Sequence, residues 1–115
     1  MTTPPFALRV ADVALAREPL PPEQVVAGAP ETGARELWRS PDGTVSIGIW
    51  EHTAGSSTDV EADEVFVVIS GRATIAFDGG RQLEVGPGDV VELRAGDRTT
   101  WTVHETLRKV YTVVG

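Results

Sequence analysis

Apolar and polar residues alternate along most of the chain beyond Leu37, with the period of two that is typical of β-strands. Val45, Ile47 and Ile49, for example, fall on one face of a single predicted strand. Residues 65–69 form instead a continuous apolar run, which predicts a strand buried on both faces. No window keeps an apolar stripe of helical period for three turns, so we expect no long amphipathic helix.

Tight-turn sequences separate the predicted strands. Proline presets the backbone for a turn and glycine accepts a positive φ, so Ser-Pro-Asp-Gly at 40–43 and Asp-Gly-Gly at 78–80 are strong turn signals. Short strands at this spacing predict a β-sandwich or a β-barrel. The strands expected around the turns cover residues 37–39, 45–51, 65–69, 73–77, 82–85, 90–93, 99–103 and 108–114.

The N-terminal third of the chain differs from the rest because it carries most of the prolines. Proline cannot donate to a strand ladder, so this zone is expected to supply wrapping loops and edge strands, the latter at residues 6–10 and 24–27. We therefore predict one domain over residues 1–115, in which residues 1–36 wrap a barrel core at 37–115.

Composition and charge narrow the classes of function. The chain has 10 Lys and Arg against 17 Asp and Glu, a formal net charge of −7, so phosphate backbones are repelled and no nucleic-acid partner is expected. No apolar run approaches the roughly 20 residues that span a bilayer, and no secretory signal is recognisable. We expect a cytoplasmic protein without membrane contact. The absence of Cys excludes disulfides and thiolate metal sites.

Two segments go beyond a generic β domain. The first begins at Glu64 and reaches Gly71, with six residues between them, and the second is Gly-Pro-Gly-Asp at 86–89 followed by Arg-Ala-Gly at 94–96. Their order and spacing resemble the two sequence motifs of the cupin superfamily. Further matches point to its small single-domain members of the ethanolamine-utilisation and ureidoglycine-aminohydrolase type, and these lie at 48–51, 54–55, 63–64, 101–103 and 108–109.

The resemblance covers roughly residues 28–113 and implies a cupin fold, an all-β, double-stranded β-helix with a jelly-roll-like barrel. In that family the motifs supply three His and one Glu to a metal ion. Here the three His positions are occupied by Thr58, Val60 and Thr99, and Glu64 alone is retained. Threonine is a poor metal ligand and valine is none. We therefore expect neither a metal ion nor another cofactor.

The resemblance also implies which side chains meet inside the barrel. A small-molecule site combines apolar walls with a few convergent polar groups, and the expected lining has that character. Trp101 is interpreted either as a stacking wall or as ordinary core, and His52 either as a residue at the barrel mouth or as a surface residue. The expected lining consists of His52, Thr58, Val60, Glu64, Phe66, Thr99 and Trp101.

Glu64 is the candidate catalytic residue of this cavity. A carboxylate buried without a partner is costly, and a carboxyl group in a cavity is a candidate general acid or base. The alternative is that Glu64 is a relic of the metal site, held by Thr99 or a water molecule.

Three functions stay open at this stage. The first is a small-molecule-binding cupin with a degenerate, metal-free site. The second is a metal-independent isomerase, lyase or hydrolase that uses Glu64 as general acid or base. The third is a dimeric scaffold without a ligand. A homodimer is expected because the N-terminal zone and the apolar run at 65–69 offer pairing surfaces.

Overall fold

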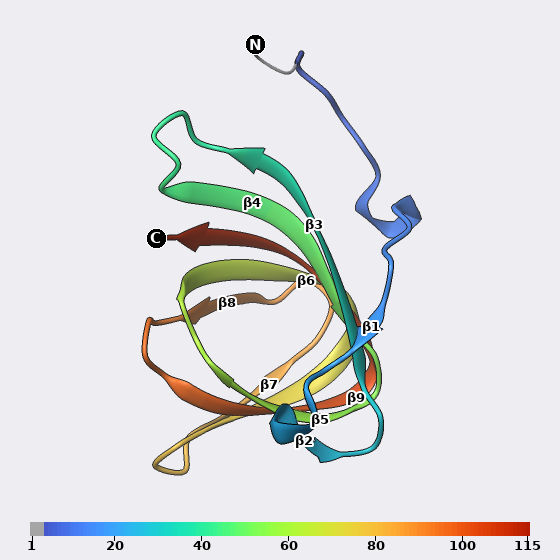
Figure 1. Ribbon diagram of the computed structural model, residues 1–115, viewed down its shortest axis with the longest axis vertical. Coiled ribbons are helices and arrows are strands. Elements are labelled where there is room, and N and C mark those ends of the chain that lie inside the picture. The colour runs from blue at the N-terminus through green and yellow to red at the C-terminus, as the bar shows by residue number, and fades with distance from the viewer. Residues whose placement is uncertain (1–3) are drawn as a thin grey trace.

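The computed structural model describes residues 4–115, and within this range nine strands form one strongly curled sheet (Figure 1). This confirms the all-β barrel predicted from the sequence. Two short 3-10 helices, Val10–Asp12 and Pro22–Gln24, precede the main strands. No helix among the described residues is long and apolar enough to cross a membrane. The strands are β1 (Glu18–Pro19), β2 (Val25–Ala27), β3 (Glu31–Arg39), β4 (Val45–His52), β5 (Gly55–Val60), β6 (Asp63–Phe77), β7 (Gln82–Val85), β8 (Val90–Leu93) and β9 (Arg98–Val114).

Strand β9 organises the barrel because it pairs with three other strands. Its first part pairs with β5, as in the antiparallel partners Trp101 and Ser57. Its last part pairs with β4, where Lys109 lies opposite Trp50. Along almost its whole length β9 also pairs with β6. The sheet therefore wraps around a single interior, and side chains of alternate residues on β9 point into it.

A glycine allows β6 to bend at the corner of the barrel. The sequence predicted two strands here, and the structure joins them into one strand of 15 residues. Gly71 lies at the bend with φ +86°, where a Cβ atom would collide with the carbonyl oxygen of Thr106. The register between β6 and β9 shifts between Val68 and Ala73 on either side of it. Only glycine combines this backbone conformation with so close an approach.

The apolar run at the start of β6 is buried on one face only. Phe66 and Val68 point inward and are each 1% exposed. Val65 and Val67 point outward and are 45% and 37% exposed. The prediction of a strand buried on both faces is therefore wrong for this chain. The outer face of β6 meets solvent because no element of the described chain packs over these two valines.

The N-terminal segment lies across the outer face of β3 (Figure 1). Residues 6–10 form no strand, contrary to the prediction. The backbone at the end of this segment is bound by a side chain instead. Arg108 donates to the carbonyl oxygens of Val10 and Val13. The second predicted edge strand is confirmed as β2, which pairs with β5 at the end of the sheet.

Candidate functional site

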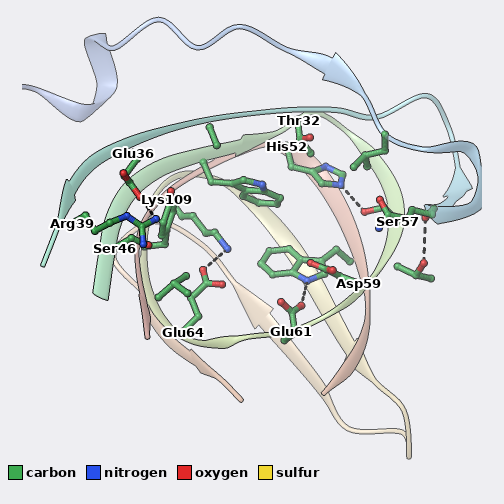
Figure 2. A pocket seen from close by; sticks show the side chains of 18 residues that line it. Thr32, Glu36, Arg39, Ser46, His52, Ser57, Asp59, Glu61, Glu64 and Lys109 are labelled. Carbon is green, nitrogen blue, oxygen red and sulfur yellow. Dashed lines mark hydrogen bonds and ion pairs between the residues drawn. The ribbon is translucent and has the colours of Figure 1, made fainter. Parts of the chain in front are cut away.

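The barrel encloses a cavity of about 410 Å³ that opens to solvent (Figure 2). Trp50 from β4 and Trp101 and Tyr111 from β9 form aromatic walls. Gly48 makes room for one of them, because a Cβ atom there would collide with the Tyr111 ring. The volume falls within the range of small-molecule sites, roughly 300–1,000 Å³.

An ion pair lies at the centre of the cavity wall. The Lys109 ammonium approaches Oε2 of Glu64 to 2.6 Å, and the two side chains are only 6% and 9% exposed. The approach does not have hydrogen-bond geometry, since Glu64 Oε2 is buried without a hydrogen-bond partner among the described residues. The two charges thus neutralise each other, and Glu64 Oε2 is shielded from solvent.

Three aromatic rings surround the Lys109 ammonium. Its nitrogen lies 4.4 Å from the ring centre of Trp50, 4.2 Å from that of Phe66 and 5.0 Å from that of Trp101. The negative faces of such rings attract a cation within about 6 Å. Lys109 is the only lysine of the chain. Its ammonium is therefore fixed in the barrel interior by both the carboxylate and the rings.

Glu61 is a second buried carboxylate at the cavity. Its Oε2 accepts hydrogen bonds from Thr99 Oγ1 at 2.6 Å and from Trp101 Nε1 at 2.9 Å. These bonds hold the Trp101 indole in a fixed orientation against the cavity. Glu61 lies between β5 and β6 and is buried there.

His52 and Ser57 form a hydrogen-bonded pair at another part of the cavity wall. His52 Nε2 lies 2.8 Å from Ser57 Oγ, and His52 Nδ1 lies 2.6 Å from the carbonyl oxygen of Thr53. Both side chains are buried. Burial lowers the pKa of His52 below its usual 6.5, and the positive charge of Lys109 acts in the same direction.

The charges around the cavity are mostly negative. Asp59 lines the cavity, and partial burial together with the charges of Glu61 and Glu64 raises its pKa. At another part of the lining, Arg39 and Glu36 form an exposed pair at 2.5 Å. The exposed Asp59 and the buried carboxylates of Glu61 and Glu64 thus line the same cavity as the Lys109 ammonium.

The structure brings some of the predicted lining residues to the cavity and not others. His52, Glu64 and Trp101 line it, and Thr58 lies at its edge with an exposed side chain. Val60 does not line it and is 57% exposed. The reason is the register of β5, in which Ser57 and Asp59 face Trp101 and Thr99 across the ladder. The inward positions are therefore one residue earlier than the motif spacing predicted.

Phe66 and Thr99 are buried beside the cavity rather than on its surface. Phe66 packs 5.7 Å from Trp101, ring centre to ring centre, and lies beneath Lys109. Thr99 donates to Glu61 and does not contact Glu64 by a hydrogen bond. The expectation that Thr99 holds Glu64 is wrong, because Lys109 takes that place.

The side chains do not fit the metal site that the cupin resemblance implies. The inward residues at the first two ligand positions are Ser57 and Asp59, and Thr99 occupies the third. The only retained ligand, Glu64, already pairs with an ammonium. Among residues 4–115 no group of three or more His, Cys, Asp or Glu side chains converges on a common point.

Sequence reasoning missed several residues of the site, Lys109 above all. A charged residue in an alternating strand is normally assigned to solvent. The alternation itself carried the signal, since Leu107, Lys109 and Tyr111 share one face of β9 and that face is inward. Trp50 and Ser57 also line the cavity, and neither was among the lining residues that the sequence predicted.

Comparison with known proteins agrees with this geometry. A family model described as the EutQ-like cupin domain matches residues 39–111. A protein of unknown function from Pseudomonas syringae pv. tomato superposes with a TM-score of 0.78 at 25% identity, over 90% of this chain and 45% of that one. This chain therefore spans less than half the length of that protein. None of the curated proteins compared with the chain matches it.

Two further solved structures share the barrel. The EutQ protein of Clostridium difficile has a TM-score of 0.72 at 16% identity, over 94% of this chain and 85% of that one. Ectoine synthase from P. lautus has a TM-score of 0.67 at 17% identity, over 95% of this chain and 77% of that one. At these identities the likeness shows a common fold and leaves the chemistry to the site itself.

Proposed function

Because the chain belongs to the EutQ-like cupin domain family, we propose that it binds a small organic molecule in the barrel cavity without a metal ion. The observation that carries the proposal is the Lys109–Glu64 pair, which is buried and faces the cavity between aromatic walls. Replacement of a buried ion pair by apolar residues of similar size often leaves stability unchanged or raises it. Stability alone therefore does not account for this pair, which supports a role in ligand recognition.

The cavity chemistry supports a particular kind of ligand head group. An ammonium has three donors, so Lys109 can hold Glu64 and still donate to an acceptor on the ligand. Glu64 also lines the cavity, and its carboxylate can accept a hydrogen bond from the same ligand. A planar head group that offers one acceptor and one donor, such as a primary amide, complements both. The indoles of Trp50 and Trp101 line the cavity, and such aromatic walls suit a flat apolar body.

The binding proposal is tested by NMR with three flat probes of similar size. Benzamide offers a donor and an acceptor, benzoate only acceptors, and toluene neither. We expect benzamide to shift the indole N–H signals of Trp50 and Trp101 more than the other two probes do. The signal of Trp38 is the internal control, because this indole is half-exposed and outside the cavity lining. The protein is purified in EDTA and its metal content is measured.

Lys109→Met removes the ammonium and keeps much of the side-chain volume, so the benzamide shifts should be lost. Arg72→Gln is the matched control, because it breaks the exposed Arg72–Glu105 pair outside the cavity. The proposal is wrong if benzamide leaves both cavity indoles unshifted. It is also wrong if the shifts persist in Lys109→Met, or if EDTA abolishes them and a divalent cation restores them.

The alternative functions have less support. For a metal-independent enzyme, Glu64 would act as general acid or base, but its carboxylate is already paired with the Lys109 ammonium at 2.6 Å. For a scaffold without a ligand, Trp101 and Phe66 would fill the barrel, whereas a cavity lies beside them. A homodimer stays a prediction for either function, and sedimentation velocity tests it.

A further inference from the structure

The His52–Ser57 pair at the cavity wall has a fixed proton arrangement. A carbonyl oxygen only accepts hydrogen bonds, so the 2.6 Å contact with Thr53 requires the proton to be on His52 Nδ1. In the neutral imidazole this leaves Nε2 as an acceptor. The 2.8 Å contact is then donated by the Ser57 hydroxyl to Nε2. The serine proton thus already points at a base, and a backbone carbonyl orients that base.

This arrangement has the three parts of an activated nucleophile. They are a hydroxyl, a base within hydrogen-bond distance and a group that orients the base. The base stays neutral at physiological pH because burial lowers its pKa. Trp50 packs against the imidazole with ring centres 5.5 Å apart, which further restricts its orientation. Both His52 and Ser57 line the cavity, so a small molecule in the cavity reaches the hydroxyl.

The neighbouring serine shows what a merely structural hydroxyl looks like in the same strand. Ser56 is also buried, but it is on the opposite face of β5 and bonds to the Thr102 hydroxyl at 3.1 Å. It does not line the cavity and has no basic partner. Ser57 differs from Ser56 in its base and in its access to the cavity, and a nucleophilic serine needs both.

We propose that Ser57 is a nucleophile for small carboxylic esters, with His52 as its general base. The Ser57 oxygen attacks the ester carbonyl carbon, and its proton passes to His52 Nε2. The bond from carbon to the leaving alkoxide breaks, and the alkoxide takes that proton from His52. Water then attacks the acyl-serine, gives a proton to His52 and releases the carboxylic acid, and the proton returns to Ser57. Binding of a benzamide-like ligand beside Lys109 is a separate property of the cavity.

The first experiment uses phenylmethylsulfonyl fluoride, whose reaction forms a bond from Ser57 oxygen to sulfur and releases fluoride. Intact mass followed by peptide mapping should locate the adduct on Ser57 in the wild-type protein. Ser57→Ala should abolish it, and Ser56→Ala should react like the wild type. His52→Gln should slow the reaction about 100-fold or more, the range of general-base catalysis.

The pH dependence separates base catalysis from the intrinsic reactivity of a serine. Since the pKa of His52 lies below 6.5, the labelling rate should be flat above about pH 7.5 and fall at lower pH as His52 is protonated. An unassisted serine would react faster with each rise in pH. Hydrolysis of p-nitrophenyl acetate should follow the same profile and be lost in Ser57→Ala.

Two results would overturn the proposal. One is a wild-type protein that takes up no sulfonyl group on Ser57. The other is a labelling rate that His52→Gln leaves unchanged. Far-UV circular dichroism checks that each variant folds, and the mapping on wild-type protein decides the matter even where a variant does not. Benzamide shifts at the cavity tryptophans should persist in Ser57→Ala, so failure here is distinguishable from failure of the binding proposal.

Discussion

Arg108 and Lys109 are neighbours on β9, yet they lie on opposite faces of the sheet and form very different ion pairs. Arg108 points outward, pairs with Glu51 at 3.4 Å and donates to two carbonyl oxygens of the N-terminal segment at 2.7 and 2.6 Å. Lys109 points inward, pairs with Glu64 at 2.6 Å and is surrounded by aromatic rings. Both pairs are buried, so burial alone does not tell their roles apart.

What separates the two regions is charge balance and hydrogen bonding. On the outside, Arg17 and Arg108 both contact Glu51, and Arg108 binds the N-terminal backbone as well. That cluster is complete and holds a segment in place. On the inside, Glu64 Oε2 contacts the Lys109 ammonium but has no aligned hydrogen-bond donor among the described residues, and the carboxylates of Asp59 and Glu61 line the same cavity. A cluster whose polar atoms have hydrogen-bond partners stabilises the fold. A cluster that lacks such partners beside a cavity is a candidate binding site.

The largest change in the free energy of unfolding should come from breaking the outer Arg108–Glu51 pair. Arg108→Ala removes the donor to two backbone carbonyls and leaves Glu51 with Arg17 alone, so we expect a loss of about 3 kcal/mol in the free energy of unfolding. Urea denaturation measures it. Arg72→Ala, which removes an exposed pair with Glu105, should change the same quantity by less than about 1 kcal/mol. A loss below 1 kcal/mol for Arg108→Ala would remove the distinction between the two clusters.

A smaller loss in the free energy of unfolding is expected for the inner Lys109–Glu64 pair. Its size should depend on whether one or both partners are removed. Lys109→Met leaves the Glu64 carboxylate buried without a cation, so we expect a loss of about 2 kcal/mol. The double variant Lys109→Met, Glu64→Leu should be within about 1 kcal/mol of the wild type, because no uncompensated charge stays behind. Both variants should lose benzamide binding. A double variant less stable than the single one would mean that the inner pair is structural.

The smallest change in stability concerns Asp59, one of the carboxylates that line the cavity. Because the pKa of Asp59 is raised from 3.8, the folded chain takes up its proton more readily than the unfolded chain. The contribution of Asp59 to stability therefore falls as pH rises above about 3.8. Asp59→Asn should be more stable than the wild type at pH 7, by about 0.5 kcal/mol or less, and this gain should shrink at pH 4. Urea denaturation at the two pH values measures it, and a gain that increases in acid would contradict it.

The fold was largely predictable because strands and turns are encoded locally. The alternation in β4, the hairpin between β6 and β7 and the cupin motifs all lie within short segments of sequence. The exposure of Val65 and Val67 was not predictable in this way, because it depends on whether another element covers the strand. The N-terminal segment likewise makes its contact with a residue far along the chain, since Arg108 donates to the carbonyl oxygens of Val10 and Val13.

The candidate site was predictable only in part, for reasons of register and charge. Glu64, Trp101 and His52 were expected at the cavity, and they line it. The motif spacing indicated Thr58 and Val60, and a difference of one residue in β5 exchanges every inward side chain for its outward neighbour. The inward position of Lys109 follows from alternation, but only the pairing with Glu64 and the rings makes a buried ammonium tolerable.

The pairing of β9 with β4, β5 and β6 also sets the order in which the barrel forms during vectorial synthesis. The ribosome makes Trp50, Phe66 and Glu64 before it makes Arg98–Val114. Until β9 emerges, the earlier strands lack their common partner and expose the aromatic surface that later lines the interior. Insertion of β9 requires contacts between distant parts of the chain, which are slow to form. The same event brings in Lys109, so the cavity and the charge that neutralises Glu64 are completed together.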